Sequence, residues 1–124
     1  LPENEVPPMT QPAMESTRKP PKQYTVDVLC KNGRVSFPGA AAGNVTVDAP
    51  DSTITFRPSP GSDPFTFDAI TFTPVSDEFT HVVNPAGDLV VTDRCTVNAT
   101  YSYCLTVLAN GQRIGSDPEI VNKI

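Results

Sequence analysis

The chain alternates apolar and polar residues over short segments, and turn-forming residues separate these segments. From Tyr101 to Val107 every odd position is Tyr, Leu or Val, and every even position is Ser, Cys or Thr. Such alternation with a period of two is typical of β-strands that bury one face. Nine strands are predicted on this basis: Tyr24–Cys30, Arg34–Phe37, Asn44–Asp48, Thr53–Arg57, Phe65–Phe72, Phe79–Val83, Asp88–Thr92, Tyr101–Leu108 and Glu119–Val121.

Turn signals stand between these strands, among them Asn32-Gly33, Pro38-Gly39 and Asn110-Gly111. Such pairs end regular structure and reverse the chain. No window of the sequence carries an apolar stripe at helical spacing. Short strands at regular intervals therefore predict an all-β fold, an antiparallel sandwich of two sheets.

The segment from Phe65 to Phe72 changes parity in its middle. Phe65 and Phe67 lie on one parity, whereas Ile70 and Phe72 lie on the other. The change falls at Asp68-Ala69. It predicts either a β-bulge or a strand that crosses from one sheet to the other.

The first part of the chain differs in composition from the rest. Residues 1–23 are rich in proline, have few bulky side chains and show no apolar periodicity. Such a segment buries too little surface to offset its ordering entropy. We expect residues 1–23 to form an extended, proline-rich N-terminal arm and residues 24–124 to form the β-sandwich domain.

Charge and hydropathy narrow the class of partner. Fourteen acidic and nine basic residues give a net charge of −5, which disfavours binding to the phosphate backbone of a nucleic acid. No apolar run reaches the ~18–20 residues that a membrane span needs. We therefore expect neither a nucleic-acid partner nor a membrane span.

The three cysteines raise the question of a disulfide. A bond between Cys95 and Cys104 would close a small loop, and it would imply an oxidising compartment. It is favoured because Cys104 shares the parity of Ser and Thr residues, where a lone thiol would be exposed. A Cys30–Cys95 bond and three reduced thiols remain as alternatives. Cys30 itself, on the parity of Val26 and Val28, is expected to be a small core residue.

The end of the chain resembles a known type of domain. The residues concerned are Tyr101, Tyr103, Leu105, Val107, Gly111, Asp117, Pro118, Ile120 and Asn122. This pattern is similar to that of small exported bacterial β-sandwich domains of the cupredoxin-like or immunoglobulin-like type, in which an aromatic strand precedes an Asp-Pro-x-Ile segment. The resemblance covers about the last third of the chain. It implies a β-sandwich and a secreted, periplasmic or cell-envelope location.

Catalytic and cofactor motifs are absent from the sequence. A blue-copper site needs two imidazoles and a thiolate, and the chain has one histidine, His81. No nucleophile elbow occurs, and nearly all the acidic residues stand in turns, where Asp caps backbone amides. We expect a protein that is not an enzyme and that binds no cofactor or resident metal.

A non-enzymatic exported protein-interaction or accessory domain of an envelope or secreted assembly is the favoured function. It would bind a protein partner by shape or by strand addition at a sheet edge, and the arm could also join copies of the chain into a homo-oligomer. The alternatives are a glycan-binding module, a calcium site using Asp88, Asp93 and Asp117, and a small enzyme inhibitor. The candidate partner contacts in the arm are Pro7, Pro8, Pro12, Arg18, Lys19, Pro20 and Pro21.

Overall fold

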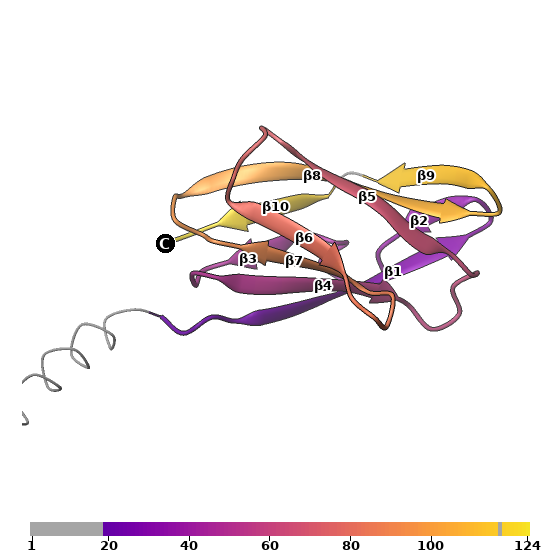
Figure 1. Cartoon of the computed structure of the whole chain (residues 1–124), viewed down its shortest axis with the longest axis horizontal. Coiled ribbons are helices and arrows are strands. Elements are labelled where there is room, and N and C mark those ends of the chain that lie inside the picture. The colour runs from indigo at the N-terminus through magenta and orange to yellow at the C-terminus, as the bar shows by residue number, and fades with distance from the viewer. Residues whose placement is uncertain (1–18, 117) are drawn as a thin grey trace, which may run out of the picture.

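A computed structural model describes residues 19–116 and 118–124, which form two β-sheets stacked face to face (Figure 1). The predicted all-β fold is confirmed, and each of the nine expected segments contains a strand. The described residues form ten strands: β1 (Gln23–Lys31), β2 (Arg34–Ser36), β3 (Val45–Val47), β4 (Ser52–Pro58), β5 (Thr66–Thr73), β6 (Phe79–Val83), β7 (Leu89–Asp93), β8 (Ala99–Ala109), β9 (Gln112–Ser116) and β10 (Glu119–Asn122).

The prediction that both sheets are purely antiparallel was wrong. The first sheet has the order β2-β1-β4-β7-β6, and β1 runs parallel to β4. The second has the order β3-β10-β8-β5, with β9 also on β8, and β3 runs parallel to β10. Alternation along a strand determines which face is buried, but it does not determine the direction of the neighbouring strand.

Two Asn-Gly turns connect the tightest hairpins. Asn32 and Gly33 have φ values of 52° and 72°, and Asn110 and Gly111 have φ values of 50° and 75°. Two successive positive φ angles define the type I′ turn, whose twist matches that of the flanking strands. The second turn leads into β9, which pairs with the end of β8 from Leu105 to Ala109.

The parity change predicted in the fifth strand is a β-bulge. Phe67 pairs with Val107 and Ala69 pairs with Thr106, so Asp68 is the extra residue. The bulge lets Phe67 and Ile70 both face the space between the sheets, although three positions separate them. Both side chains contribute to the main core cluster.

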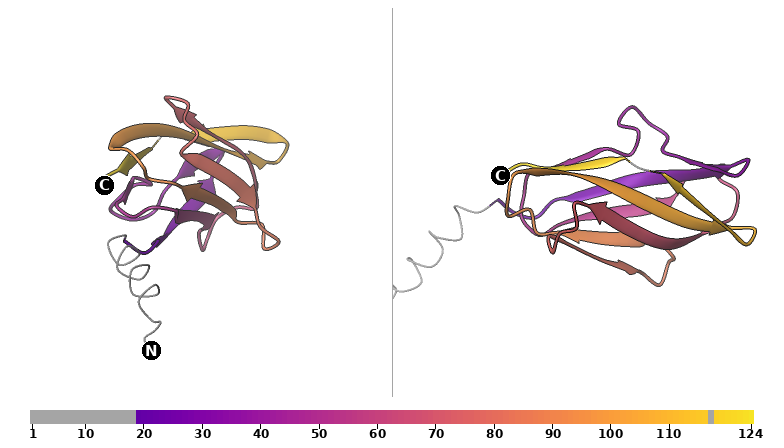
Figure 2. Two further views of the ribbon diagram at one scale, coloured as in Figure 1. Left: turned by 60° about the vertical axis from the view of Figure 1, so that its left-hand side comes forward. Right: turned by 90° about the horizontal axis from the view of Figure 1, so that it is seen from above.

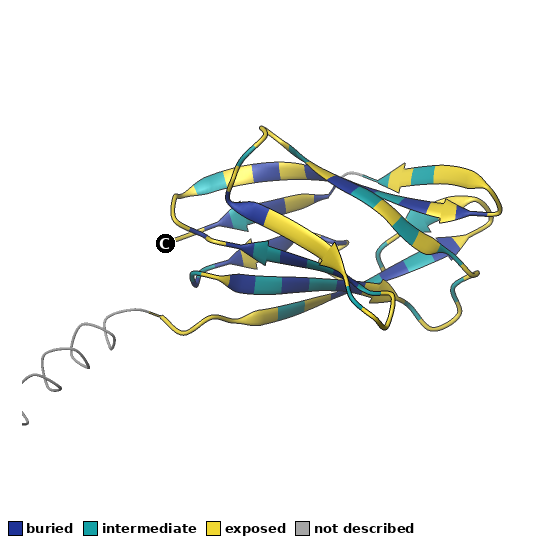
Figure 3. Cartoon of the chain, in the orientation of Figure 1, coloured by how far each residue is buried: buried dark blue, intermediate teal, exposed yellow. Residues whose placement is uncertain are grey.

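The core lies between the sheets, and buried and exposed positions alternate along most strands (Figure 3). Tyr103 and Phe56 are its largest fully buried side chains, and their ring centroids lie 5.4 Å apart in an edge-to-face arrangement. Phe72 and Phe79 stack with centroids 4.1 Å apart. Buried aromatic side chains of this size dominate the energetics of a small core.

The predicted Cys95–Cys104 disulfide is wrong, because none of Cys30, Cys95 and Cys104 forms a disulfide bond. Cys95 is buried, and its Sγ lies 3.3 Å from the backbone oxygen of Val47. Cys104 lies on the outer face of β8, where its Sγ is 4.0 Å from Oγ1 of Thr106. The two thiols therefore point to different faces. The alternative Cys30–Cys95 bond is also absent, and Cys30 is buried in a separate small cluster, as expected for a core residue.

The chain enters and leaves the sandwich at the same end. The views in Figures 1 and 2 agree that the segment leading into β1 and the C-terminus lie together there. Lys19 and Ile124 line one shallow pocket, together with Pro50 and Cys95. The Asn-Gly turns lie at the opposite end.

Candidate functional site

A groove with a volume of about 560 Å³ lies between β1 and β3. It exists because the chain changes sheets. β2 pairs with only the last three residues of β1, from Leu29 to Lys31. The chain then passes through the loop 37–44 and continues as β3 beside β10 in the other sheet. In the described part of the chain, no strand occupies the position next to the first part of β1, where β2 would have continued.

The backbone of β1 along the groove has no strand partner among the described residues. The amide of Thr53 donates to the oxygen of Lys22 at 3.0 Å, and the amide of Ser59 donates to the oxygen of Val28 at 2.8 Å. Even-numbered residues of β1 therefore direct their backbone groups to β4. Because these groups alternate along a strand, the N–H and C=O groups of Gln23, Thr25 and Asp27 face the groove.

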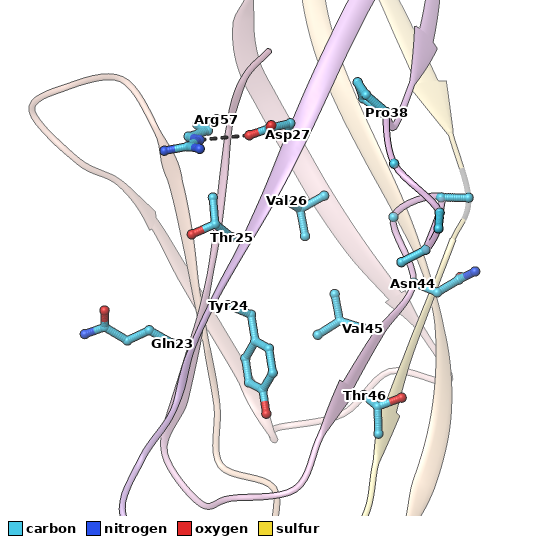
Figure 4. A pocket seen from close by; sticks show the side chains of 15 residues that line it. Gln23, Tyr24, Thr25, Val26, Asp27, Pro38, Asn44, Val45, Thr46 and Arg57 are labelled. Atoms are coloured by element: carbon cyan, nitrogen blue, oxygen red, sulfur yellow. Dashed lines mark hydrogen bonds and ion pairs between the residues drawn. The ribbon is translucent and has the colours of Figure 1, made fainter. Parts of the chain in front are cut away.

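The edge of β3 faces the same groove. The amide of Lys123 donates to the oxygen of Val47 at 2.8 Å, so the odd residues of β3 bond to β10. By the same alternation, the backbone groups of Thr46 point toward the groove. Figure 4 shows the side chains of Tyr24, Val26 and Val45 lying between the two strands, so these three side chains form an apolar part of the floor of the groove.

One wall of the groove is the loop from Pro38 to Asn44, and a buried hydrogen bond holds it in place. The hydroxyl of Tyr103 donates to the backbone oxygen of Gly43 at 2.6 Å. Burial raises the pKa of the Tyr103 phenol well above its ordinary value, so the hydroxyl keeps its proton. Gly43 has a φ of +83°, and a Cβ there would lie 2.7 Å from Cγ of Phe37. Only glycine fits this close approach.

An ion pair lies at each end of the groove. At one end Nζ of Lys22 lies 2.8 Å from Oδ1 of Asp48, and the Tyr24 hydroxyl donates to the same oxygen at 3.4 Å. The hydrogen bond from Lys22 is the main reason why the pKa of Asp48 lies below its ordinary value. At the other end Nε of Arg57 lies 2.8 Å from Oδ1 of Asp27 (Figure 4), and that hydrogen bond raises the pKa of Arg57. Both ion pairs are solvent-exposed. They therefore contribute little to the stability of the fold, and their main effect is to orient the four charged side chains.

The predicted partner contacts lie partly in the described region. Lys19, Pro20 and Pro21 are exposed and lead directly into β1, beside one end of the groove. Pro7, Pro8, Pro12 and Arg18 lie outside the described residues, as does most of the arm. The sequence therefore indicated a contact region next to the groove but did not reveal the groove. The signal available for it was a glycine-bounded turn between two short strands, 34–37 and 44–48.

The candidate metal ligands do not converge within the described residues. No group of three or more His, Cys, Asp or Glu side chains there is placed to hold a metal ion. Of the three aspartates considered for calcium, Asp93 is fully buried in the core, Asp88 is half-buried in the turn before β7, and Asp117 lies outside the described residues. His81, the single histidine, is exposed on the edge strand β6.

Comparisons with known proteins give no family for this chain. No protein-family model matches it, and no curated protein is significantly similar to it. Over residues 19–116 and 118–124, no helix is both long enough and apolar enough to cross a membrane.

Proposed function

We propose that this protein is a non-enzymatic protein-interaction domain, an accessory part of an exported assembly, which binds an extended peptide segment of a protein partner as an added strand. The observation that carries the proposal is the edge of β1 beside the groove, where Gln23, Thr25 and Asp27 present their backbone groups and no strand of residues 19–116 or 118–124 pairs with them. An exposed edge of this kind is a template for pairing with another chain.

The added strand would continue the first sheet past β1, in the position that β2 vacates. Main-chain hydrogen bonds to Gln23, Thr25 and Asp27 would supply affinity whatever the side chains of the peptide. If each bond contributes about 1 kcal/mol net, the edge alone supplies a few kcal/mol. Side-chain contacts with the apolar floor at Tyr24 and Val26 would supply the remainder and the selectivity.

A secreted, periplasmic or cell-envelope location is part of the proposal. It is supported by the resemblance of the closing aromatic strand and the Asp-Pro-x-Ile segment to exported β-sandwich domains. A disulfide does not support it, because none of the three cysteines forms one. Fractionation of the source cells, with detection of the chain by antibody, tests the location separately from the binding.

Binding is tested with peptides selected from a random display library against the full chain. Thr25→Pro removes one backbone donor from the groove edge and leaves the bonds to β4 intact. His81→Pro is the matched control, since the bonds from Arg94 N to Glu78 O and from Asn84 N to Asp88 O direct the even residues of β6 to β7. The amide of His81 therefore faces the free edge at the other side of the same sheet.

We expect Thr25→Pro to lower the affinity for the selected peptides at least tenfold, as measured by calorimetry. A tenfold loss corresponds to about 1.4 kcal/mol of binding free energy. His81→Pro should bind them as the unchanged chain does, and circular dichroism should show that both variants fold. Equal affinities for all three proteins, or a loss confined to His81→Pro, would exclude the β1 edge as the binding site.

A further inference from the structure

We infer that the strand filling the groove comes from a second copy of this chain, within residues 9–17 of its N-terminal arm. This inference rests on the proposed function and names the partner segment. Four observations support it: the shape of the groove, the positions of the prolines in the arm, the matching lengths of the β1 edge and the arm segment, and the way the chain enters β1.

The groove can accept a single extended segment, but it cannot accept a strand that already belongs to another folded sheet. β1 forms one side of the groove. β3 and the loop from Pro38 to Asn44 form the other side, and both are fixed to the second sheet through β10 and Tyr103 (Figure 4). A strand that already belongs to a sheet brings neighbours on its far side, and the loop stands where they would lie. A segment with no strand beside it can enter.

The prolines in this part of the arm all fall on even-numbered positions, so the odd-numbered residues keep the backbone amides that strand pairing requires. A strand added to β1 becomes the new edge, so only every second residue must offer its N–H to β1, and proline is tolerated at the residues between. From residue 8 to residue 19 the two prolines, Pro8 and Pro12, both fall on even positions. The odd positions retain every amide: Met9, Gln11, Ala13, Glu15 and Thr17.

The lengths also agree. The open edge of β1 presents three outward-facing residues, Gln23, Thr25 and Asp27, and three successive odd residues of the arm match them. Two-residue spacing is the same on both strands, at about 6.6–6.8 Å. Registers that begin at Met9, Gln11 or Ala13 each place three residues with backbone amides opposite the three outward-facing residues of β1.

The entry of the chain into β1 disfavours docking of the arm on its own domain. Lys22 is held to β4 by its amide, which donates to Oγ of Ser52 at 3.0 Å, and by its oxygen, which accepts from Thr53 at 3.0 Å. The chain therefore approaches β1 along the strand axis, from the end of the sandwich where Lys19 lies near Ile124. Pro20 and Pro21 hold the residues before them out of the helical conformation that a tight reversal requires. The arm can reach the groove of a neighbouring copy without reversing its direction.

The experiment compares two double substitutions in the full chain. Ala13→Pro with Thr17→Pro leaves no three successive odd amides between residues 9 and 19. Met14→Pro with Ser16→Pro adds as many prolines to the same stretch, on the even positions that face away. Neither pair changes the charge. Sedimentation velocity over a wide concentration series reports the assembly, and a synthetic peptide of residues 8–18 serves as competitor.

We expect the unchanged chain and Met14→Pro/Ser16→Pro to assemble as concentration rises. Ala13→Pro/Thr17→Pro should remain at the 13.3 kDa monomer mass, as should Thr25→Pro. An excess of the 8–18 peptide should return the assembled chain to monomers. Reciprocal exchange of arms would give a closed dimer, and one-way exchange an open series of oligomers.

Three outcomes would overturn the inference: equal effects of the two proline pairs, an unchanged chain that stays monomeric at every concentration, or a monomer whose Thr25 amide is protected from hydrogen exchange by its own arm. If the selected peptides bind in a manner that depends on Thr25 in any of these cases, the proposed function stands without this partner. If Thr25→Pro affects neither the selected peptides nor assembly, both proposals fail.

Discussion

Asp93 and Asn122 form a buried polar pair that joins the end of β7 in one sheet to β10 in the other. Oδ1 of Asp93 accepts from Nδ2 of Asn122 at 3.0 Å and from the amide of Cys95 at 2.9 Å. Oδ2 of Asp93 and Oδ1 of Asn122 are buried and have no hydrogen-bond partner among the described residues. Both unpaired atoms are acceptors when Asp93 is ionised, and one proton on Asp93 supplies the missing donor.

This pair should make the stability of the domain depend on pH. Burial, as the main cause, raises the pKa of Asp93 to about 6, and the nearby carboxylate of Glu78 acts in the same direction. The unfolded value is about 3.9, so the folded state binds the proton more tightly. The contribution of Asp93 is then fully present below about pH 4, and it is lost as the pH rises through about 6, at a cost of about 3 kcal/mol.

Asp93→Asn isolates this contribution because an amide at position 93 offers the donor at every pH. We expect that, as the pH rises from about 4 to about 7, the free energy of unfolding of the unchanged chain falls relative to that of the variant. Urea unfolding at a series of pH values measures this difference. At neutral pH the variant should be the more stable protein. Parallel pH profiles for the two proteins would show that Asp93 is ionised throughout.

At the scale of the elements, strand positions follow from local sequence, but strand partners do not. The alternation at Val45 and Val47, at Ile54 and Phe56, and from Tyr101 to Val107 marks a buried face, and each of these segments is a strand. β9 was missed because Gln112–Ser116 contains one large apolar residue, Ile114. The Asn110-Gly111 turn was the signal for it, since a type I′ turn requires a returning strand.

The candidate groove depends on a choice that local sequence does not make. β2 and β3 are short and separated by a turn, and nothing within them states that β2 joins β1 while β3 joins β10. That choice follows from contacts distant in sequence, such as the bond from Tyr103 to Gly43. The sequence therefore predicted strand addition at some sheet edge, and the proposal of a particular edge, that of β1, needed the structure.

The bulge in β5 leads to a prediction about deletions. Removing Asp68 would turn the bulge into a regular ladder and would still leave Phe67 and Ile70 on the core face. The loss would be the exposed ion pair with Arg113, at 3.2 Å, and some local twist. We expect this variant to fold and to lose no more than about 1–2 kcal/mol.

Deletion of Thr71 is the control for the deletion of Asp68, because it shortens the same strand by one residue. It would place Ile70 and Phe72 on opposite faces and move one of them out of the core. The cost should exceed about 3 kcal/mol, since a large side chain loses its burial and leaves a cavity. Thermal unfolding of both variants measures the difference, and equal losses would show that the bulge has no part in setting the register.

At the scale of the whole molecule, no disulfide joins the two sheets, so packing and buried hydrogen bonds such as that between Asp93 and Asn122 hold them together. A crosslink between Cys95 and Cys104 would have stabilised the fold by about 2–3 kcal/mol through the unfolded chain. We therefore expect the unfolding temperature of the purified protein to be the same with and without a thiol reductant. Alkylation in denaturant without reductant should modify all three cysteines. A mass deficit of two hydrogens, removed by reductant, would contradict this.

The common position of the chain entry and the C-terminus has a mechanical consequence. β1 belongs to one sheet and β10 to the other, and the free ends of both strands emerge at the same end of the sandwich. A force that draws these two ends apart would peel β1 and β10 away from their sheets. The backbone hydrogen bonds of each terminal strand would then break one after another instead of all at once. Such a domain should yield at low tension, which suits a module suspended from an assembly better than one placed in series along a stretched fibre.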